Sequence, residues 1–327
     1  MASAGTQNIN DTNHEDFSDV MKIVEPEKTP WFSSLRKGKK PTNVYHEWPL
    51  DSLADVRVQS VAEGHDPAEF LNKGVNRQRI GNFVTIMEEG WHVTDLQMLS
   101  NPAGVDDMAA DGKAKAMSEW KRNCAARFGG DYELKEGTAG TNYESRGLGN
   151  WISNSAQSLR PVPSAYRTPA PSINTTATGS LAEADVNDVL TSVFQQGGNR
   201  VTGSVYANVN WKVGLSRFAR QTTANLNYRI NEDASTNKIT RNVTVYEGDF
   251  GTVNVVPDLF IGYGGTDASR LARAYYSDSE LVELNWMEAL YHIQGLNPGG
   301  GPRGTWKGTC TLSVLNPLGF AKWAATS

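Results

Sequence analysis

The sequence predicts an α+β protein, and three observations lead to this fold class. Polar and apolar residues roughly alternate over residues 41–93, which indicates an extended β-ribbon. Apolar residues then recur at helical spacing over residues 104–128, which predicts one long helix. After residue 180, helical patterns are mixed with short strand patterns that are typical of a largely antiparallel sheet.

The ribbon is the unusual element, because a two-stranded ribbon has a single layer and is marginal in water by itself. Two arms of about 20 residues would reach about 65 Å at roughly 3.3 Å per residue. This is longer than a small domain is wide. We therefore expect a neighbouring copy of the same chain to supply the surface on which the ribbon lies.

The composition describes a chain of 327 residues with a net charge of -5 and a mean hydropathy of -0.48. No apolar run approaches 18 residues and the first ten residues are small and polar, so we expect neither a membrane span nor a signal peptide. A protein that binds nucleic acid phosphate by phosphate is basic, and this chain is acidic. Cys124 and Cys310 have no metal-type spacing; we interpret both as buried thiols, with a disulfide as the less favoured alternative.

The N-terminal 40 residues are predicted to form a polar arm with three features. A weak helical patch at Phe17–Val24 ends before Pro26. An apolar anchor follows at Thr29–Leu35, which either packs on its own domain or docks the arm elsewhere. The basic run Arg36–Lys40 is interpreted as a solvated turn, with a contact to an acidic neighbour or to nucleic acid as the alternative.

The ribbon itself has an outgoing strand at Asn43–Trp48 and a return strand at Gly81–Met87. Glycine and proline near Ala62–Pro67 and Asn72–Gly74 supply turn chemistry at the far end. A metal site at His65 and its acidic neighbour is disfavoured, because the segment offers no further ligand.

The long helix is predicted to begin near Gly104, after a cap at Asn101, and to end at Gly129. About 22 residues would span roughly 33 Å. Its apolar stripe is expected to consist of Met108, Ala109, Met117, Trp120, Cys124 and Phe128.

The second half begins with a Gly-, Ser- and Pro-rich segment at residues 131–178, interpreted as a linker or an elaborated surface loop. A helix follows, with Ser180 as its cap, Glu183 completing a capping box and Gly197 ending it. Further strands are predicted at residues 201–209, 239–246, 253–256 and 304–314, and further helices at 210–220 and 318–325.

Catalytic chemistry finds little support in the sequence. No nucleotide-binding glycine loop, zinc-protease motif or serine-hydrolase motif occurs. The five histidines are scattered, and Asp106–Asp107 lies at a helix start, where carboxylates favour the helix dipole. We predict no catalytic, cofactor-binding or metal-binding residue and no cofactor. An enzyme whose site forms only in three dimensions, a tail-tube or decoration protein, and a cellular nanocompartment shell remain as alternatives.

Several stretches together resemble tailed-phage major capsid proteins of the Hong Kong 97 fold, closest to the podovirus branch typified by phage SU10. None is a catalytic motif, and their agreement in order and spacing carries the resemblance. Thr85 stands where that branch commonly has glutamine, so no specific loop contact is carried over. The stretches are Lys28–Phe32, Glu47–Leu53, Glu63–Gly64 with Asn82–Ile86, Trp91–Gln97 and Trp306–Pro317.

The resemblance implies a division of the chain into the parts of that fold. The expected parts are an N-terminal arm at 1–40, an extended loop called the E-loop at 41–93, a P-domain at 94–180 with its spine helix at 104–128 and the long surface loop, an A-domain at 181–270, and C-terminal strands at 271–327 that return to the P-domain and end in a closing helix.

The resemblance also implies a structural role. The chain is expected to self-assemble into hexamers and pentamers of an icosahedral phage head, in the cytoplasm of a bacterial host, and to enclose double-stranded DNA with only weak contact. Implied partners are a separate scaffolding protein, a portal protein and, as an option, a decoration protein. Our candidate contacts between subunits, chosen because Trp and Arg dominate interface energetics, are Phe17, Trp31, Trp48, Arg57, Arg77 and Arg79.

Overall fold

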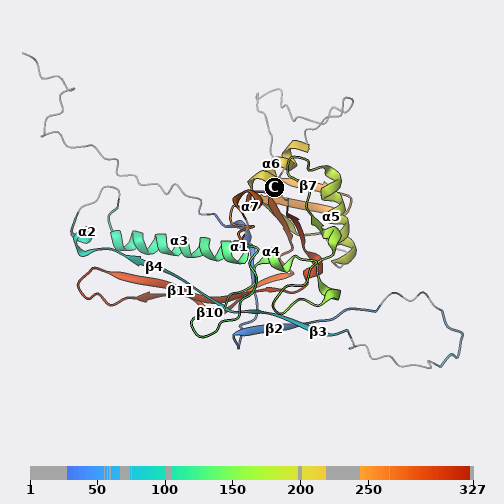
Figure 1. The fold of residues 1–327 in the computed structure, drawn as a ribbon, viewed down its shortest axis with the longest axis horizontal. Coiled ribbons are helices and arrows are strands. Elements are labelled where there is room, and N and C mark those ends of the chain that lie inside the picture. The colour runs from blue at the N-terminus through green and yellow to red at the C-terminus, as the bar shows by residue number, and fades with distance from the viewer. Residues whose placement is uncertain are drawn as a thin grey trace, which may run out of the picture.

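The structure is a computed structural model of the chain. It has a long flat layer, in which a helix lies along a sheet, and a rounder part at one end of that helix (Figure 1). The residues described are 28–54, 56, 58, 60–66, 74, 76–100, 105–197, 201–218, 244–264 and 266–324.

The long layer is a four-stranded sheet with helix α3 (Met108–Phe128) on one face. The two central strands are antiparallel to each other, and both outer strands come from the first third of the chain. In sheet order the strands are β1 (Arg36–Lys37), β10 (Val282–Gln294), β11 (Arg303–Val314) and β4 (Thr85–His92).

Helix α3 begins at Met108, four residues later than predicted, because Asp107 caps it by accepting from the backbone N–H groups of Ala109 and Ala110. The predicted cap Asn101 lies outside the described residues. The predicted end at Gly129 is confirmed. Met117 is 47% exposed, so its place in the predicted stripe is wrong. The buried face consists of Ala116, Trp120, Cys124, Ala125 and Phe128.

Trp120 fixes α3 to the sheet. Its ring stacks on Trp286 of β10 with centroids 5.8 Å apart, and its Nε1 donates to the Met87 carbonyl of β4 at 2.9 Å. Gly308 of β11 allows this close approach, since a Cβ there would lie 3.0 Å from the Trp120 ring. Cys124 and Cys310 are buried and unbridged, as expected.

The rounder part holds a six-stranded sheet with helices α5 (Glu183–Gln196) and α6 (Val209–Phe218), and α7 (Asp267–Leu271) lies beside α6. Tyr206 and Tyr275 of this sheet share the core of the long layer. A second core within the rounder part includes the ring pair Trp211–Trp323, with centroids 5.1 Å apart. In sheet order the strands are β5 (Ile173–Asn174), β12 (Ala321–Ala324), β9 (Arg273–Ser277), β6 (Ser204–Ala207), β8 (Gly251–Pro257) and β7 (Val245–Gly248).

Helix α5 confirms the predicted helix in its apolar stripe and in its end at Gly197, but its cap differs. The prediction of Ser180 with Glu183 is wrong. The helix begins at Glu183, and the Asp185 carboxylate accepts from the N–H of Ala182 at 2.8 Å.

The predicted closing helix at residues 318–325 is also wrong. A 3₁₀ turn at Pro317–Gly319 leads into strand β12, which lies between β5 and β9. Ala321 and Trp323 are buried while Lys322 between them is partly exposed. This is the two-residue period of a strand, and it decides the structure of so short a segment.

Within the residues described, the paired part of the ribbon is shorter than predicted. It consists of β2 (Tyr45–Leu50) and β3 (Gln78–Phe83), which pair with each other. The expected return arm divides at Val84, because the next eight residues form β4 and pair with β11 instead. The basic run is corrected as well: Arg36–Lys37 is a strand on the edge of the long layer, where a turn was expected.

Short helices complete the described part. The segment at residues 131–178 has little regular structure, but Arg146 in it is fully buried. Within the described ranges, no helix combines the length and the apolar character needed to cross a membrane. The short helices are α1 (Pro30–Ser34), α2 (Asp95–Leu99), α4 (Leu148–Trp151) and 3₁₀ turns at Ser164–Tyr166 and Ala170–Ser172.

Candidate assembly surfaces

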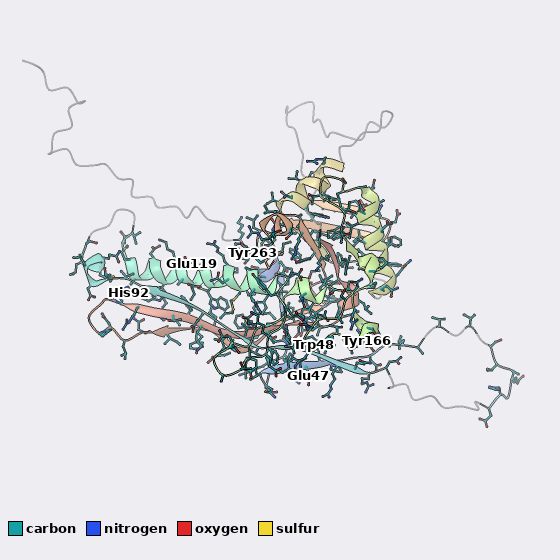
Figure 2. All side chains as sticks on the ribbon, in the orientation of Figure 1. Glu47, Trp48, His92, Glu119, Tyr166 and Tyr263 are labelled. Carbon is teal, nitrogen blue, oxygen red and sulfur yellow. The ribbon has the colours of Figure 1, made fainter. Side chains whose placement is uncertain are left out.

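The root of the β2–β3 ribbon is held by its own chain. Trp48 is 8% exposed, its Nε1 donates to the Val314 carbonyl at 3.0 Å, and its ring lies 5.7 Å from that of Trp151. Tyr166 donates its hydroxyl to the Asn76 carbonyl at 2.6 Å, beside the start of β3 (Figure 2). The indole of Trp48 is thus largely enclosed by the core of its own chain, and a contact of Trp48 with a neighbouring subunit stays a prediction.

Trp31 is likewise part of the chain's own core. It is 1% exposed, its backbone N–H donates to the Asp258 carboxylate at 2.9 Å, and its Nε1 donates to the Ser277 hydroxyl at 3.4 Å. Burial raises the pKa of Asp258, and the backbone N–H groups of Trp31 and Phe260 oppose this by stabilising the carboxylate. The anchor at residues 29–35 therefore packs on its own domain, and a contact of Trp31 with a neighbouring subunit stays a prediction.

The arginine candidates lie on the surface of the ribbon. Arg77 pairs with Asp51 at 3.1 Å, and Arg79 with Glu47 at 3.8 Å, through largely exposed side chains. Both stay candidates for a contact with a neighbour. Phe17 and Arg57 lie outside the described residues, so they stay predictions.

Beyond β2 the chain exposes a row of branched apolar side chains that the prediction did not include. Leu53, Val56, Val58 and Val61 are 97, 90, 94 and 70% exposed. They follow one another along an extended segment that projects from the body (Figure 1). Its signal in the sequence is a set of apolar residues just before the predicted turn, whereas the predicted contacts there were Trp and Arg residues.

The opposite end of the long layer carries a second apolar surface, which we call the tip. Leu96 and Leu99 of α2 are 79 and 85% exposed, and Leu296 in the β10–β11 connection is 88% exposed. The two segments lie together, since the His92 ring and the Gly300 carbonyl are 2.8 Å apart (Figure 2). Neither segment was among the candidate contacts predicted from the sequence.

Reactive groups in the described part of the chain are inert or dispersed. Burial raises the pKa of both the Cys124 and Cys310 thiols, which keeps them protonated at neutral pH. Among the residues described, no group of three His, Cys, Asp or Glu side chains is placed to hold a metal ion. The arrangement provides two exposed apolar surfaces, the loop row and the tip, at opposite ends of a rigid layer (Figure 1).

Comparison with solved structures places the fold among phage capsids. The chain is similar to a protein of Gordonia phage Cozz, with 14% identity and a TM-score of 0.55 over 97% of this chain and 92% of that one. It is similar to the capsid of Myoviridae phage XM1, with 10% identity and a TM-score of 0.59 over 98% and 100%. The predicted Hong Kong 97 type of α+β fold is thereby confirmed.

The nanocompartment alternative has weaker support. The SrpI encapsulin complex from Synechococcus elongatus PCC 7942 matches with 12% identity and a TM-score of 0.50, over 95% of this chain and 91% of that one. No curated protein matches the chain.

The sequence itself settles the family. The model of the family described as SU10 major capsid protein matches residues 3–327, which is nearly the whole chain. This is a family of structural proteins, and it confirms the interpretation of the chain as a shell subunit with no enzymatic role. The chain belongs to the SU10 major capsid protein family and is a structural subunit of a phage capsid.

Proposed function

We propose that this capsid subunit forms the hexamers and pentamers of an icosahedral head through the loop row and the tip, and that the head encloses double-stranded DNA. The observation that carries the proposal is the loop row, in which four branched apolar side chains are at least 70% exposed. Such surfaces on a soluble chain mark interaction sites. An exposed apolar segment far from the core gains stability only by lying on another subunit.

The rigid root and the exposed far end give the loop a mechanical role. Trp48 and Tyr166 fix the ribbon where it leaves the body, so β2 and β3 leave the body in a defined direction. Contacts made at the end of such an arm tolerate small changes of angle between subunits. One chain can then serve in rings of five and rings of six. Arg77 and Arg79 remain candidates to direct the arm onto a neighbour.

The proposed partners follow from the same role. Assembly would take place in the host cytoplasm with a separate scaffolding protein and a portal protein, and a decoration protein could bind outside. DNA contact is proposed to be weak, because 36 acidic residues outnumber 31 basic ones. Arg36, in the basic run, is already paired with Glu283 at 2.6 Å. Filter binding of the unassembled subunit to duplex DNA near 150 mM salt should show no nanomolar affinity.

The test of the shell proposal is the double variant Val56→Ser with Val58→Ser. It removes two exposed apolar side chains and should leave the melting temperature of the subunit unchanged while closed shells disappear from electron micrographs. The matched control is Ser52→Ala with Ser60→Ala, which alters the same segment without removing apolar surface. Normal shells from the valine variant, or equal loss in both, would refute the proposal.

A further inference from the structure

An open apolar groove lies beside helix α3, on the side of the long layer away from β4. It has a cavity volume of about 500 Å³. The stacked rings of Trp120 and Trp286 lie in it, and Phe32 of α1, Met117 of α3 and Leu290 of β10 line it further. Met117 is 47% exposed, which is unusual for a side chain beside two tryptophans.

The groove exists because the edge of the sheet is only partly covered. Strand β1 pairs with β10 at Glu283 and Leu284 and then leaves the sheet. From Trp286 onward, that edge of β10 has no strand partner within the described part of the chain. Apolar side chains that β1 would otherwise cover therefore line an open channel.

Two lysines give the groove a positive rim. Lys37 of β1 and Lys121 of α3 line the same cavity and are both exposed. An occupant that fits must therefore present an apolar face between negatively charged groups.

The sequence just before the described region has this pattern. Phe17, Val20, Met21 and Val24 recur at spacings of three and four, which would place them on one helical face. Between Glu15 and Glu27 the sequence has five acidic residues and one basic residue.

The segment also has the necessary reach. Helix α1 begins at Pro30, and Phe32 within it is one wall of the groove. The five residues Glu25–Thr29 can span up to about 17 Å when extended. A segment tethered this closely has an effective concentration in the millimolar range at the groove.

We propose that Phe17–Val24 binds as two helical turns in the groove of its own chain. Its apolar face covers Met117, Trp120 and Trp286, and its acidic side chains face Lys37 and Lys121. This assigns Phe17 a contact within its own chain, in place of the contact with a neighbouring subunit predicted from the sequence.

Disulfide trapping in the unassembled full-length chain tests the proposal. The native thiols are buried and have raised pKa values, so introduced cysteines react alone. The double variant Val20→Cys with Met117→Cys, oxidised by copper phenanthroline, should form an intrachain disulfide that shifts the monomer on a non-reducing gel.

The matched control is Val20→Cys with Glu119→Cys. Glu119 lies on α3 but faces the β4 side, where burial and then the charge of Glu119 raise the pKa of Glu89. We expect at least tenfold less disulfide in this control. Equal yields in both variants, or none in either, would overturn the proposal. A mixture of the two single variants Val20→Cys and Met117→Cys that gives linked dimers would also overturn it, because the occupant would then be a second copy.

Hydrogen exchange gives a readout that needs no new cysteine. In the unassembled chain, the amides of residues 17–24 should be protected at least tenfold relative to a free peptide of the same sequence. Lys121→Glu should remove this protection, and Glu119→Lys should leave it intact. Absence of protection in the unsubstituted chain, or protection unaffected by Lys121→Glu, would contradict the proposal.

Discussion

The ammonium group of Lys322 lies 3.3 Å from the Asp131 carboxylate and donates to the Gly149 carbonyl at 2.8 Å. Arg273 reaches the same carboxylate oxygen at 3.1 Å. Both cations are largely buried, with side chains 12% exposed. Asp131 follows directly after the end of α3, so one carboxylate joins the long layer to β9 and β12 of the rounder part.

Asp131→Asn should therefore destabilise the subunit strongly. It leaves Lys322 and Arg273 buried without a counter-ion, a change that costs about 3 kcal/mol when one partner of a buried pair is removed. Urea unfolding of the unassembled subunit measures this. The control is Asp111→Asn, which breaks the exposed pair with Lys115 and should cost less than about 0.5 kcal/mol. A similar loss of unfolding free energy in the two variants would contradict the stabilising role of Asp131 between Lys322 and Arg273.

Substitutions of Trp48 should lower the stability of the free subunit, because its indole is buried in the core of its own chain. Trp48→Phe keeps a ring but leaves the buried Val314 carbonyl without its donor, at a cost of about 1–3 kcal/mol. Trp48→Ala should cost about 3–5 kcal/mol, because it also opens a cavity. Chemical denaturation of the free subunit is the measurement. A free subunit of unchanged stability that fails to assemble would instead support Trp48 as an interface residue.

Substitutions of Arg77 and Arg79 should affect shell assembly and leave the stability of the free subunit nearly unchanged. Their ion pairs are exposed, so Arg77→Ala with Arg79→Ala should change the unfolding free energy by less than about 1 kcal/mol. If these side chains contact a neighbour, the yield of closed shells on a sucrose gradient should fall several-fold. Lys115→Ala, which breaks an exposed pair on α3, is the control for loss of a surface charge.

His46 should make the root of the ribbon sensitive to acid. Its Nε2 lies 2.9 Å from the Asn285 side-chain nitrogen, and burial, followed by the charge of Lys39, lowers the pKa of His46 below its usual 6.5. The unfolded chain then binds more protons between the two pKa values, so stability rises with pH through this window and falls on acidification. The melting temperature should drop more between pH 7.5 and 5 in the unsubstituted chain than in His46→Gln. The exposed His65→Gln is the control and should keep the full drop.

Alanine substitutions at two glycines of the β10–β11 connection should distinguish the cost of backbone strain from the cost of a steric collision. Gly299 and Gly301 both have φ near +106°, but a Cβ at Gly299 meets nothing within 4 Å, while one at Gly301 would collide with the Val93 carbonyl. Gly299→Ala should cost about 1–2 kcal/mol from its backbone conformation alone. Gly301→Ala should cost more and displace α2, which faster amide exchange at Leu96 and Leu99 would report. Equal losses of unfolding free energy in the two variants would contradict this expectation, because the Cβ at residue 301 would then not collide with the Val93 carbonyl.

The longer helices were predictable because their signals lie within a few residues, whereas the short closing segment at residues 318–325 was not. The stripe of α5 and the end of α3 follow from spacing and from glycine at the helix end. The membership of strands in sheets was not predictable in this way. Strand β4 continues the sequence pattern of β3 across Val84, yet it pairs with β11, which lies more than 200 residues away.

The candidate surfaces show the same limit. Trp31 and Trp48 were chosen because aromatic rings anchor interfaces, but the same apolar area suits a core, and the sequence does not distinguish the two. In the structure, β9 contacts the Trp31 ring, and β11 and Trp151 contact the Trp48 ring. These elements come from distant parts of the chain, so the burial of the two tryptophans has no local signal in the sequence. The apolar residues of the loop row and the tip are present in the sequence, but their exposure follows only from which other apolar residues fill the core.

The position of β12 between β5 and β9 has a consequence for biosynthesis. Ile173 of β5 pairs with Lys322 of β12, roughly 150 residues later in the chain. Arg36 of β1 likewise pairs with Glu283 of β10, which is synthesised much later. At about 5–20 residues per second, the ribosome delivers the partner of β5 some 8 to 30 s after β5 itself. Both sheets thus stay incomplete during most of translation. A nascent chain cannot yet present a finished surface to its neighbours, which separates synthesis in time from polymerisation.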